Sequence, residues 1–423
     1  MKERAESHPD GINRRSALGT AAGIVAGLAA PGIALRAFSQ SPQAPGHAGQ
    51  AIIPADATKV PGAASTALGA RSQFVSPVLS PTGVITGASF TPLQDLAGTI
   101  TPSDLHFQRH HNGIALIDPD RFELIVHGMA DRARAFSLDE LKRFPSVTRV
   151  CFVECAGNGR SAFRNPRPEM SPQVVDGLTS NSEWTGVLVS TLLREVGAKR
   201  GASWVLAEGG DAAVLSRSVP IAKMLDDAII AYAQNGEPLR VANGYPVRLL
   251  LPGYEGNMNI KWLRRLELTD QPNMSRDETS KYTDPLPGGK ARQFSFVMDA
   301  KSVITHPSYP EMLPKAGWWP VSGLAWSGRG RITAVDVSTD RGVTWMPAKL
   351  SGDALPMAHT RFELMWKWDG RPTTLMSRAR DETGYVQPSV AAYRTGRGLG
   401  TDYHFNAIRS WSVDGDGRVF FAG

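Results

Sequence analysis

The pattern of hydrophobic and polar residues divides the chain into two regions of different character. From about residue 83 to 270, strand-like and helix-like patterns are mixed. Residues 121–127 alternate with the period of a strand, whereas residues 189–196 have the spacing of a helix closed by Gly197. Further short elements are expected at 137–144, 204–207, 221–225 and 245–252. This region is therefore predicted to be an α+β domain.

From residue 294 onward the pattern is that of strands alone. Residues 331–338 alternate between apolar and polar, and residues 340–342 supply a turn before a further strand at 343–345. Similar strands are expected at 362–368 and 373–379. Short strands at this spacing are typical of an immunoglobulin-like sandwich. The polar stretch 271–293, rich in Pro and Gly, is predicted to be the linker between the two domains.

The N-terminus has the features of an export signal. Arg14 and Arg15 precede a weakly apolar segment, rich in Ala and Gly, that ends near Leu35. This arrangement is typical of a twin-arginine signal, which sends folded proteins across the bacterial membrane. The alternative is a membrane anchor, but the glycines and the proline in the segment make a poor spanning helix. We expect a twin-arginine signal at 1–40, a loosely ordered arm at 41–82 and a periplasmic protein.

Composition narrows the classes of partner. The chain has 423 residues, of which 42% are hydrophobic and 20% charged, as is ordinary for a globular protein. The net charge is +6, and no Lys/Arg block with interleaved aromatic residues marks a nucleic-acid surface. A small anionic substrate or an acidic protein partner suits this mild excess of positive charge. Neither nucleic acid nor a membrane is expected as a partner.

Cys151 lies in the hydrophobic stretch at 147–153, and Cys155 comes two residues after it. Cys151 and Cys155 are four residues apart and would face the same side of a strand, so no disulfide is expected between them. Cys155 opens a loop of small residues that ends in Arg160. Cations and loop N–H groups lower the pKa of a thiol, and glycines let a bulky cofactor approach the backbone. We interpret Cys155 as a reactive or metal-binding thiolate, the alternative being a buried free cysteine near a turn.

Three neighbouring histidines raise the hypothesis of a zinc site. His106, His110 and His111 are close in sequence, but adjacent histidines point in different directions and no carboxylate or thiol has ligand spacing. Zinc is therefore not favoured. Arg109 with its neighbouring histidine suits an anion better, because a guanidinium binds an oxyanion through two parallel hydrogen bonds.

Three motifs, in this order, resemble those of the sulfite oxidase family of molybdenum enzymes. They are Phe107-x-Arg109-x-His111, then Cys155-Ala-Gly-Asn-x-Arg160, then Gly244-Tyr-Pro-Val-Arg248 followed by Lys261-Trp-Leu. The resemblance runs from about residue 85 to the C-terminus. It is greatest to the SoxC-type molybdenum subunit of bacterial sulfite or sulfane dehydrogenases, which residues 252–265, 278–283, 290–294 and 403–406 also resemble. It implies a molybdopterin-binding α+β domain at 83–270 and an all-β, immunoglobulin-like dimerisation domain at 294–423.

The resemblance also implies a role for each matching residue. Cys155 would ligate molybdenum, because a soft thiolate suits a metal that is also held by the two sulfurs of a pterin dithiolene. The substrate oxyanion would be surrounded by Arg109, Arg160, Trp184 and Tyr232. A further pocket arginine is expected from the second domain, where Arg331 is a better match than Arg329. The pterin and its phosphate would be bound by Arg109, His111, Asp211, Asn243, Arg248, Asn259 and Lys261.

The implied activity is oxygen-atom transfer at a molybdenum–molybdopterin cofactor. Its substrate would be sulfite or a protein-bound sulfane sulfur, and the sequence leaves both open because both need a cationic pocket. The chain has no Cys-x-x-Cys-His motif for haem attachment, so the electrons would pass to a separate c-type cytochrome. A homodimer through the C-terminal domain, and a sulfur-carrier protein for a protein-bound substrate, are the other partners that the resemblance implies.

Two other functions are weighed against this one. A molybdenum-dependent sulfoxide reductase of the same superfamily would be shorter and would lack the β-sandwich, so residues 294–423 count against it. A non-catalytic secreted binding protein that uses an immunoglobulin-like module would contain no molybdenum. Metal content therefore separates this last class from the enzymes.

Overall fold

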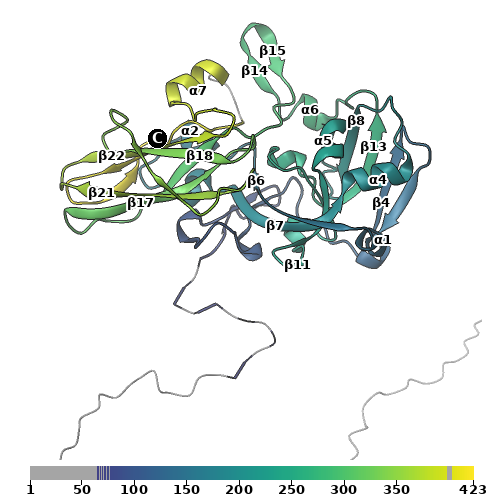
Figure 1. The fold of residues 1–423 in the computed structure, drawn as a ribbon, viewed down its shortest axis with the longest axis horizontal. Coiled ribbons are helices and arrows are strands. Elements are labelled where there is room, and N and C mark those ends of the chain that lie inside the picture. The colour runs from purple at the N-terminus through teal and green to yellow at the C-terminus, as the bar shows by residue number, and fades with distance from the viewer. Residues whose placement is uncertain are drawn as a thin grey trace, which may run out of the picture. The chain divides into compact units, whose positions relative to one another are not determined.

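The computed structural model describes residues 77–397 and 403–423, together with single positions and pairs between 64 and 75. The chain divides into two units, Met1–Gly69 and Ala70–Gly423. The expected signal at 1–40 and most of the arm at 41–82 lie outside the described residues. Both predicted domains belong to the second unit (Figure 1). Within the described part of the chain, no helix has the length and apolar character needed to cross a membrane.

Two β-sheets form the framework of the first domain. One has the order β5-β4-β13-β8-β9, with bounds Arg134–Ser137, Glu123–Gly128, Leu263–Thr269, Trp204–Gly209 and Ser216–Pro220. The other has the order β11-β10-β7-β6, with β12 paired to β10, and bounds Glu237–Pro238, Ile229–Gln234, Thr179–Leu188, Ser146–Glu154 and Arg248–Leu250. Only the β4–β13 pair of these two sheets is parallel among the described strands.

The first core lies between these sheets and three helices. The helices are α1 (Leu138–Arg143), α4 (Val189–Val196) and α5 (Ile221–Asp226). Residues with no exposed surface from both sheets and from α4 form one apolar cluster, which includes Leu124, Ile230, Leu249, Leu192 and Leu193. Burial of such side chains stabilises the domain by about 1.5–3 kcal/mol each. A small sheet of β1 (Ser80–Pro81), β2 (Ala88–Phe90) and β3 (Gln108–Arg109) places Arg109 at its edge.

Local signals in the sequence predicted several of these elements correctly. Helix α4 spans the predicted residues and is closed by Gly197, whose φ of 68° is the left-handed conformation that glycine adopts easily. Ser137 and Glu140 form the expected capping box of α1. The predicted strand at 245–252 is reduced to β12, and residues 343–345 are not a strand.

The second domain is a sandwich of two antiparallel sheets. One has the order β16-β17-β21-β20, with bounds Lys301–His306, Gly317–Trp326, Thr360–Trp368 and Lys349–Ser351. The other has the order β19-β18-β22-β23-β24, with bounds Met346–Pro347, Ile332–Ser338, Thr373–Asp381, Ser410–Val413 and Val419–Phe421. Their inner faces share a core that includes Val321, Phe362, Trp366 and Trp411. The predicted fold class, an α+β domain followed by an all-β sandwich, is confirmed.

The stretch between the two domains contains regular structure. It holds α6 (Arg276–Thr279) and a hairpin of β14 (Asp284–Leu286) and β15 (Lys290–Arg292). Figure 1 shows this hairpin projecting at the side where the two domains meet. Arg276, in α6, and Tyr282, which follows it, line a cavity together with Cys155.

Candidate functional site

Two adjoining cavities surround the thiol of Cys155. The narrow cavity has a volume of about 60 Å³ and the wide cavity about 330 Å³. Five residues line both of them: Arg109, His111, Cys155, Leu215 and Tyr282. The thiol therefore lies where the two cavities meet.

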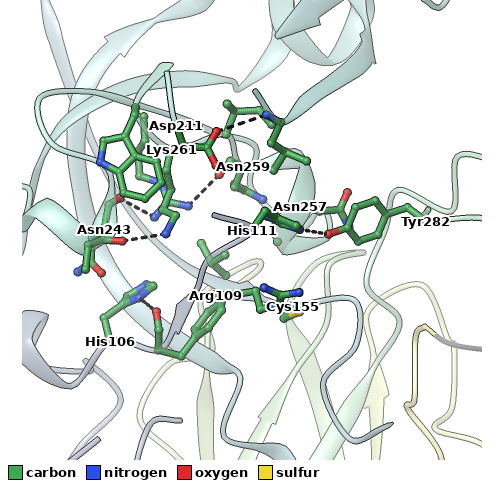
Figure 2. A pocket seen from close by; sticks show the side chains of 18 residues that line it. His106, Arg109, His111, Cys155, Asp211, Asn243, Asn257, Asn259, Lys261 and Tyr282 are labelled. Carbon is green, nitrogen blue, oxygen red and sulfur yellow. Dashed lines mark hydrogen bonds between the residues drawn. The ribbon is translucent and has the colours of Figure 1, made fainter. Parts of the chain in front are cut away.

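The structure brings together most of the residues predicted to form the site. The predicted metal ligand Cys155 and every residue predicted to bind the cofactor line the narrow cavity (Figure 2): Arg109, His111, Asp211, Asn243, Arg248, Asn259 and Lys261. Arg160 lines the wide cavity. These residues come from widely separated elements, among them β3, β12 and the loops that follow β6 and β8.

Two aromatic residues predicted to face the substrate do not reach either cavity. Trp184 is fully buried, its indole N–H donates to the carbonyl of Cys151 at 3.2 Å, and its ring lies 5.0 Å from the guanidinium carbon of Arg248. Tyr232 lies at a β-bulge in β10 and packs, partly buried, against the first core. Trp184 thus packs against the guanidinium of Arg248, and Tyr232 packs against the first core.

The predicted arginine of the second domain is also absent from both cavities. Arg331 is exposed and pairs with Glu382, with 3.0 Å between Nε and Oε2. Arg329 pairs with Asp299 at 2.7 Å. Each arginine is held by a carboxylate of its own domain, which draws it away from the site.

Several lining residues had no predicted role. His106 and Asn257 line the narrow cavity, Arg276, Lys281 and Tyr403 line the wide one, and Tyr282 lines both. Residues 278–283 and 403–406 were singled out only because they resemble the SoxC-type subgroup. No local pattern shows that these segments fold back onto Cys155.

Backbone contacts hold the loop of residues 155–159, called the Cys155 loop. Cys155 follows β6 directly, and its N–H donates to the carbonyl of Leu178 at 2.9 Å. Its own carbonyl accepts from the N–H of Asn158 at 2.9 Å. Gly159 has a φ of 88°, and a Cβ there would collide with the side chains of Arg409 and Asp176. Glycine is required at this position on both grounds.

Electrostatics at the thiol differ from the sequence-based expectation. Cys151 and Cys155 are both free thiols. Burial raises the pKa of Cys155 above its ordinary value, and the N–H of Gly157 and the cations Arg109 and Arg160 oppose this effect without outweighing it. The loop N–H and the cations thus act in the expected direction, but burial outweighs them. A bound metal ion would supply the charge that keeps the thiol deprotonated.

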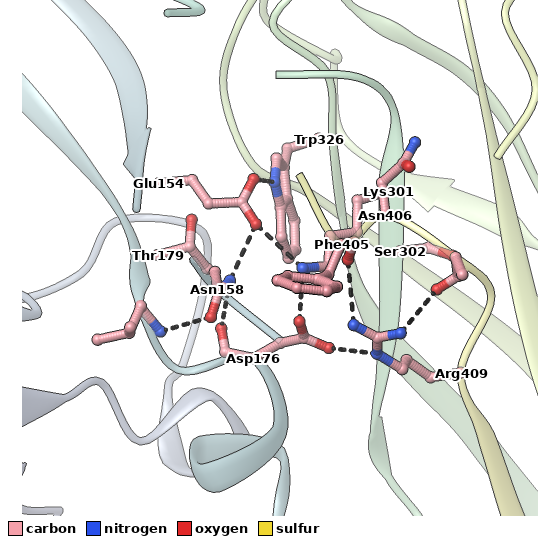
Figure 3. A network of polar contacts seen from close by, with 12 residues as sticks. Glu154, Asn158, Asp176, Thr179, Lys301, Ser302, Trp326, Phe405, Asn406 and Arg409 are labelled. Carbon is pink, nitrogen blue, oxygen red and sulfur yellow. Dashed lines mark hydrogen bonds and ion pairs between the residues drawn. The ribbon is translucent and has the colours of Figure 1, made fainter. Parts of the chain in front are cut away.

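A buried ionic network lies directly behind the Cys155 loop (Figure 3). The ammonium of Lys301, on β16 of the second domain, is 3.1 Å from Glu154 and 2.5 Å from Asp176. The indole of Trp326 donates to Glu154 at 2.7 Å, and Arg409 binds Asp176 at 3.1 Å. The two carboxylates are at most 1% exposed. The second domain thus fixes the residue next to the candidate metal ligand.

The cations Arg248 and Lys261 line the narrow cavity without carboxylate partners among the described residues. Arg248 is buried and donates to the carbonyls of Asn243 and Asn259 at 3.1 Å each. Lys261 donates to the carbonyl of Ala242 at 2.9 Å. Within the described part of the chain, no carboxylate lies within 4 Å of either cation. Burial lowers the pKa of Arg248 to about 10 and that of Lys261 well below its ordinary value. Cations are buried at such cost where an anion binds.

Three buried nitrogens in the same cavity have no hydrogen-bond partner among the residues that the structure describes. They are Nε2 of His106, Nε of Arg248 and Nδ2 of Asn257. A buried polar atom without a partner costs about 1–3 kcal/mol, so such atoms mark places where a bound group supplies the partner. Nε of Arg248 and Nδ2 of Asn257 are donors, whereas Nε2 of His106 is an acceptor because Nδ1 donates to the carbonyl of Phe107. A negatively charged group that offers both acceptor atoms and a donor fits this lining. The phosphate and pterin of molybdopterin have these properties.

The wide cavity is lined mainly by positive charge. Arg109, Arg160, Arg276 and Lys281 line it, against one carboxylate, Asp277. A cationic cavity of this size attracts an anion and raises its local concentration.

Comparisons with known proteins agree with this arrangement. Residues 111–276 match the family described as "Oxidoreductase molybdopterin binding domain", and residues 292–410 match the "Mo-co oxidoreductase dimerisation domain". Over 331 residues the chain is 31% identical to sulfite oxidase of Gallus gallus, covering 72% of each protein. It is 29% identical to mitochondrial sulfite oxidase of Homo sapiens over 322 residues, covering 69% of this chain but only 58% of the human protein.

A solved structure is similar over almost its whole length. The crystal structure of the sulfane dehydrogenase SoxCD from Paracoccus pantotrophus matches with a TM-score of 0.84 and 43% identity. The match covers 86% of this chain and 96% of that chain. The resemblance noted in the sequence motifs is confirmed, and the chain belongs to the sulfite oxidase family of molybdopterin-dependent oxidoreductases.

Proposed function

We propose that the protein is a periplasmic molybdenum oxidoreductase that oxidises sulfite or a protein-bound sulfane sulfur and passes the electrons to a separate c-type cytochrome. The observation that carries this proposal is the position of the Cys155 thiol. It lies where a cavity with unpaired buried nitrogens meets a cavity lined by cations. The narrow cavity suits a pterin phosphate and the wide cavity suits a sulfur oxyanion.

Residues on the narrow side would hold the cofactor. Cys155 would supply the thiolate ligand, and the molybdenum–molybdopterin group, when bound, supplies the two-electron chemistry of oxygen-atom transfer. Arg248 and Lys261 would neutralise its phosphate, and Nδ2 of Asn257 would donate to one of its acceptor atoms. Nδ1 of His106 donates to the carbonyl of Phe107 at 2.9 Å, so the free Nε2 of this neutral imidazole would accept a hydrogen bond from the cofactor. Binding the phosphate would also remove the cost of burying the two cations.

Residues on the wide side would handle the substrate. Arg109 and Arg160 flank the thiol loop, and Arg276 and Lys281 extend the positive charge along the cavity. These cations would speed capture of an anion and hold its oxygens while the sulfur atom faces the reacting centre. Their charge remains fixed during the reaction, so it needs little reorganisation as charge shifts on the substrate.

The similarity to the sulfane dehydrogenase favours a sulfane sulfur as the substrate over free sulfite. A carrier protein would then present the sulfur at the wide cavity. The chain would form a homodimer through the sandwich, whose sequence matches the dimerisation domain. The same match counts against a sulfoxide reductase, which is expected to lack this domain.

Metal analysis of the purified protein tests the proposal. We expect one molybdenum per chain and at least a roughly tenfold loss of molybdenum in a Cys155→Ala variant, because this change removes the only protein ligand proposed for the metal. Cys151→Ala is the matched control. Cys151 is buried within β6, and burial raises its pKa to about 12, so it is an inert thiol.

The two outcomes are distinct. The Cys151 variant should lose some stability, about 1 kcal/mol, and keep its molybdenum. A metal-free native protein from a host that makes the cofactor would contradict the proposal, as would a Cys155 variant that retains molybdenum. Steady-state assays with sulfite and ferricytochrome c, compared with thiosulfate and a carrier protein, then identify the substrate.

A further inference from the structure

An arginine that lines neither cavity is buried directly behind the narrow one. Arg217, on β9, is fully buried. One of its terminal guanidinium nitrogens donates to the side-chain oxygen of Asn257, and Asn257 lines the narrow cavity (Figure 2). Arg217 itself is absent from the lining of both cavities. It can therefore act on a bound group only through a neighbouring side chain.

Each nitrogen of the Arg217 guanidinium meets a different residue. Nε lies 3.6 Å from Glu278 and Nη2 lies 3.5 Å from Glu255, whereas Nη1 donates to Asn257. Both carboxylates are at most 2% exposed. The guanidinium carbon also lies 5.0 Å from the centre of the Tyr282 ring. The planar fork of an arginine reaches several partners at once, whereas the ammonium of a lysine is a single point of charge. The position thus requires an arginine and not only a positive charge.

The two carboxylates beside Arg217 are fixed in turn by other segments. Glu278, in α6, accepts hydrogen bonds from the backbone N–H of Ser218 and from its hydroxyl, the latter at 3.0 Å. One carboxylate oxygen of Glu255 lies 3.2 Å from Nε2 of His404. Because each carboxylate is held by a second partner, the guanidinium between them has one fixed position.

The direction of the Asn257 amide follows from this position. An arginine offers donors only, so the amide atom that meets Arg217 must be the oxygen, and Nδ2 then faces away from the guanidinium. Nδ2 is buried and has no hydrogen-bond partner among the described residues. A reversed amide would set its Nδ2 donors against the donors of Arg217 and would turn an acceptor toward the cavity. Arg217 therefore selects one of the two amide orientations.

We propose that Arg217 is a positioning residue, which holds the Asn257 amide with Nδ2 directed at an acceptor atom of the pterin cofactor. The proposal rests on the cofactor of the proposed function and adds a residue that lies in none of the sequence motifs. Asn257 makes the contact, and Arg217 sets its direction. Because the amide is oriented before the cofactor binds, no binding free energy is lost in turning it.

Variants of the loaded protein test the proposal through the rate at which pterin leaves it, followed by pterin fluorescence. Arg217→Lys keeps the charge between the two carboxylates but loses the fork. Asn257→Ala removes the contact with the cofactor, and a double variant combines both changes. Arg134→Lys is the matched control, because Arg134 also lies between two carboxylates, Glu140 and Glu195, at 3.2 Å each, and lines neither cavity. Denaturant titration checks that each variant is folded.

We expect Arg217→Lys and Asn257→Ala each to release pterin about tenfold faster than the wild type, as for loss of one hydrogen bond. The double variant should release it no faster than Asn257→Ala, because Arg217 acts through this one side chain. Arg134→Lys should stay within about twofold of the wild type. An Arg217→Lys protein with the wild-type rate overturns the proposal. A double variant in which the two effects multiply, to about 100-fold, overturns it as well.

The change Asn257→Asp tests the direction of the amide while Arg217 stays in place. One carboxylate oxygen still accepts from Arg217, but the other puts an acceptor where the Nδ2 donor was. We expect this variant to release pterin at least about tenfold faster than the wild type. Release at the wild-type rate would mean that no donor is needed at this point, and would overturn the proposal even if Arg217→Lys does not fold.

Failure of the proposed function would look different, because none of these rates depends on turnover. A loaded wild-type protein that oxidises neither sulfite nor a sulfane donor contradicts the assigned activity, and the release rates still decide the role of Arg217. A wild-type protein that contains no pterin contradicts both proposals.

Discussion

At the scale of single residues, the site is built from groups that are costly in the absence of a ligand. Arg248 and Lys261 carry positive charge into the narrow cavity, and neither has a carboxylate within 4 Å among the described residues. Donation to backbone carbonyls compensates only part of the lost hydration. Such cations destabilise the empty protein and stabilise the complex with an anion.

A substitution of Lys261 measures both effects, the destabilisation of the empty protein and the stabilisation of the complex. The pKa of Lys261 is lowered by burial and by Arg248, so the unfolded chain binds a proton more tightly than the folded one. The stability of the cofactor-free protein should therefore rise with pH toward the ordinary lysine value near 10.4. A Lys261→Met change should stabilise the cofactor-free protein at pH 7 by about 1 kcal/mol. It should also reduce the cofactor content of protein made in a competent host.

Two measurements test these effects separately. Denaturant titration gives the stability of the cofactor-free protein, and the molybdenum and pterin content of loaded protein gives the amount of bound cofactor. Lys315→Met, at an exposed position, is the matched control and should change neither quantity. A cofactor-free Lys261→Met protein that is less stable than the wild type would show that the ammonium does not depend on an anion.

At the scale of elements, the Cys155 loop depends on contacts with the second domain. Strand β6 delivers Glu154 and Cys155 together, with the carboxylate toward Lys301 and the thiol toward the cavities. Asn158 donates from within the loop to Glu154 at 2.9 Å and to the carbonyl of Asp176 at 2.9 Å. The loop is therefore tied to α3 (Pro172–Asp176) and to β16 at the same time.

Replacing Lys301 should break this arrangement. Lys301→Met leaves two buried carboxylates with fewer partners and should cost about 3–5 kcal/mol of unfolding free energy, because removing one member of a buried pair strands the other. Molybdenum content should fall with it, since the thiolate loses its fixed position. Chemical denaturation and the Mo(V) resonance signal of loaded protein measure the two effects.

A second change separates charge from packing. Adding Glu154→Gln to Lys301→Met removes both members of one pair and should recover part of the lost stability. Lys349→Met, at an exposed position on β20, controls for the loss of a lysine. If the double variant is no more stable than Lys301→Met alone, packing rather than charge makes Lys301 important.

Elements were predictable where the determining contacts are local. The capping box of α1 and the glycine that ends α4 involve residues a few positions apart, so the sequence shows them directly. The pair His111 and Tyr282 spans 171 positions, and Glu154 and Lys301 span 147. No periodicity reports such contacts. The resemblance singled out Cys155 and the residues that line the narrow cavity, because motif residues were compared one by one.

The motifs could not give the direction of a side chain. Trp184 and Tyr232 stand at the expected places in their motifs, yet a bulge between Ala231 and Ala233 shifts the register of β10 at Tyr232. Arg331 was drawn to Glu382 of its own domain. Side-chain direction depends on register and on nearby charge, which short motifs do not encode.

At the scale of the whole molecule, the site is shared between the two domains and the stretch that joins them. Cys155 belongs to the first domain, Tyr282 to the stretch between the domains, and Tyr403 to the second domain. The N–H of His404 donates to the carbonyl of Ala156 at 2.7 Å, within the Cys155 loop. The relative position of the domains is thus part of the geometry of the site.

Buried ion pairs at this junction make the arrangement sensitive to acid. Burial alone would raise the pKa of Asp176, but Arg409 and Lys301 outweigh it and hold the pKa below its ordinary value. Burial would also raise the pKa of Glu255, but His404 and Arg217 outweigh it and hold this pKa below its ordinary value. A carboxyl with a lowered pKa stabilises the fold above its unfolded-state pKa, and this contribution is lost as pH falls through the folded-state value.

The melting temperature should therefore fall steeply below about pH 4, where the unfolded-state values of these carboxyls lie. An Asp176→Asn variant should be less stable than the wild type at pH 7 by about 3 kcal/mol. The difference should shrink as the pH falls below about 4, because the carboxyl then binds its proton in the unfolded chain and the stabilisation from the ion pairs is lost. Asp353→Asn, at an exposed position, should follow the wild type at every pH. Calorimetric melting from pH 3 to 7 measures these curves. If the gap between Asp176→Asn and the wild type stays constant over this range, the charge of Asp176 does not join the two domains.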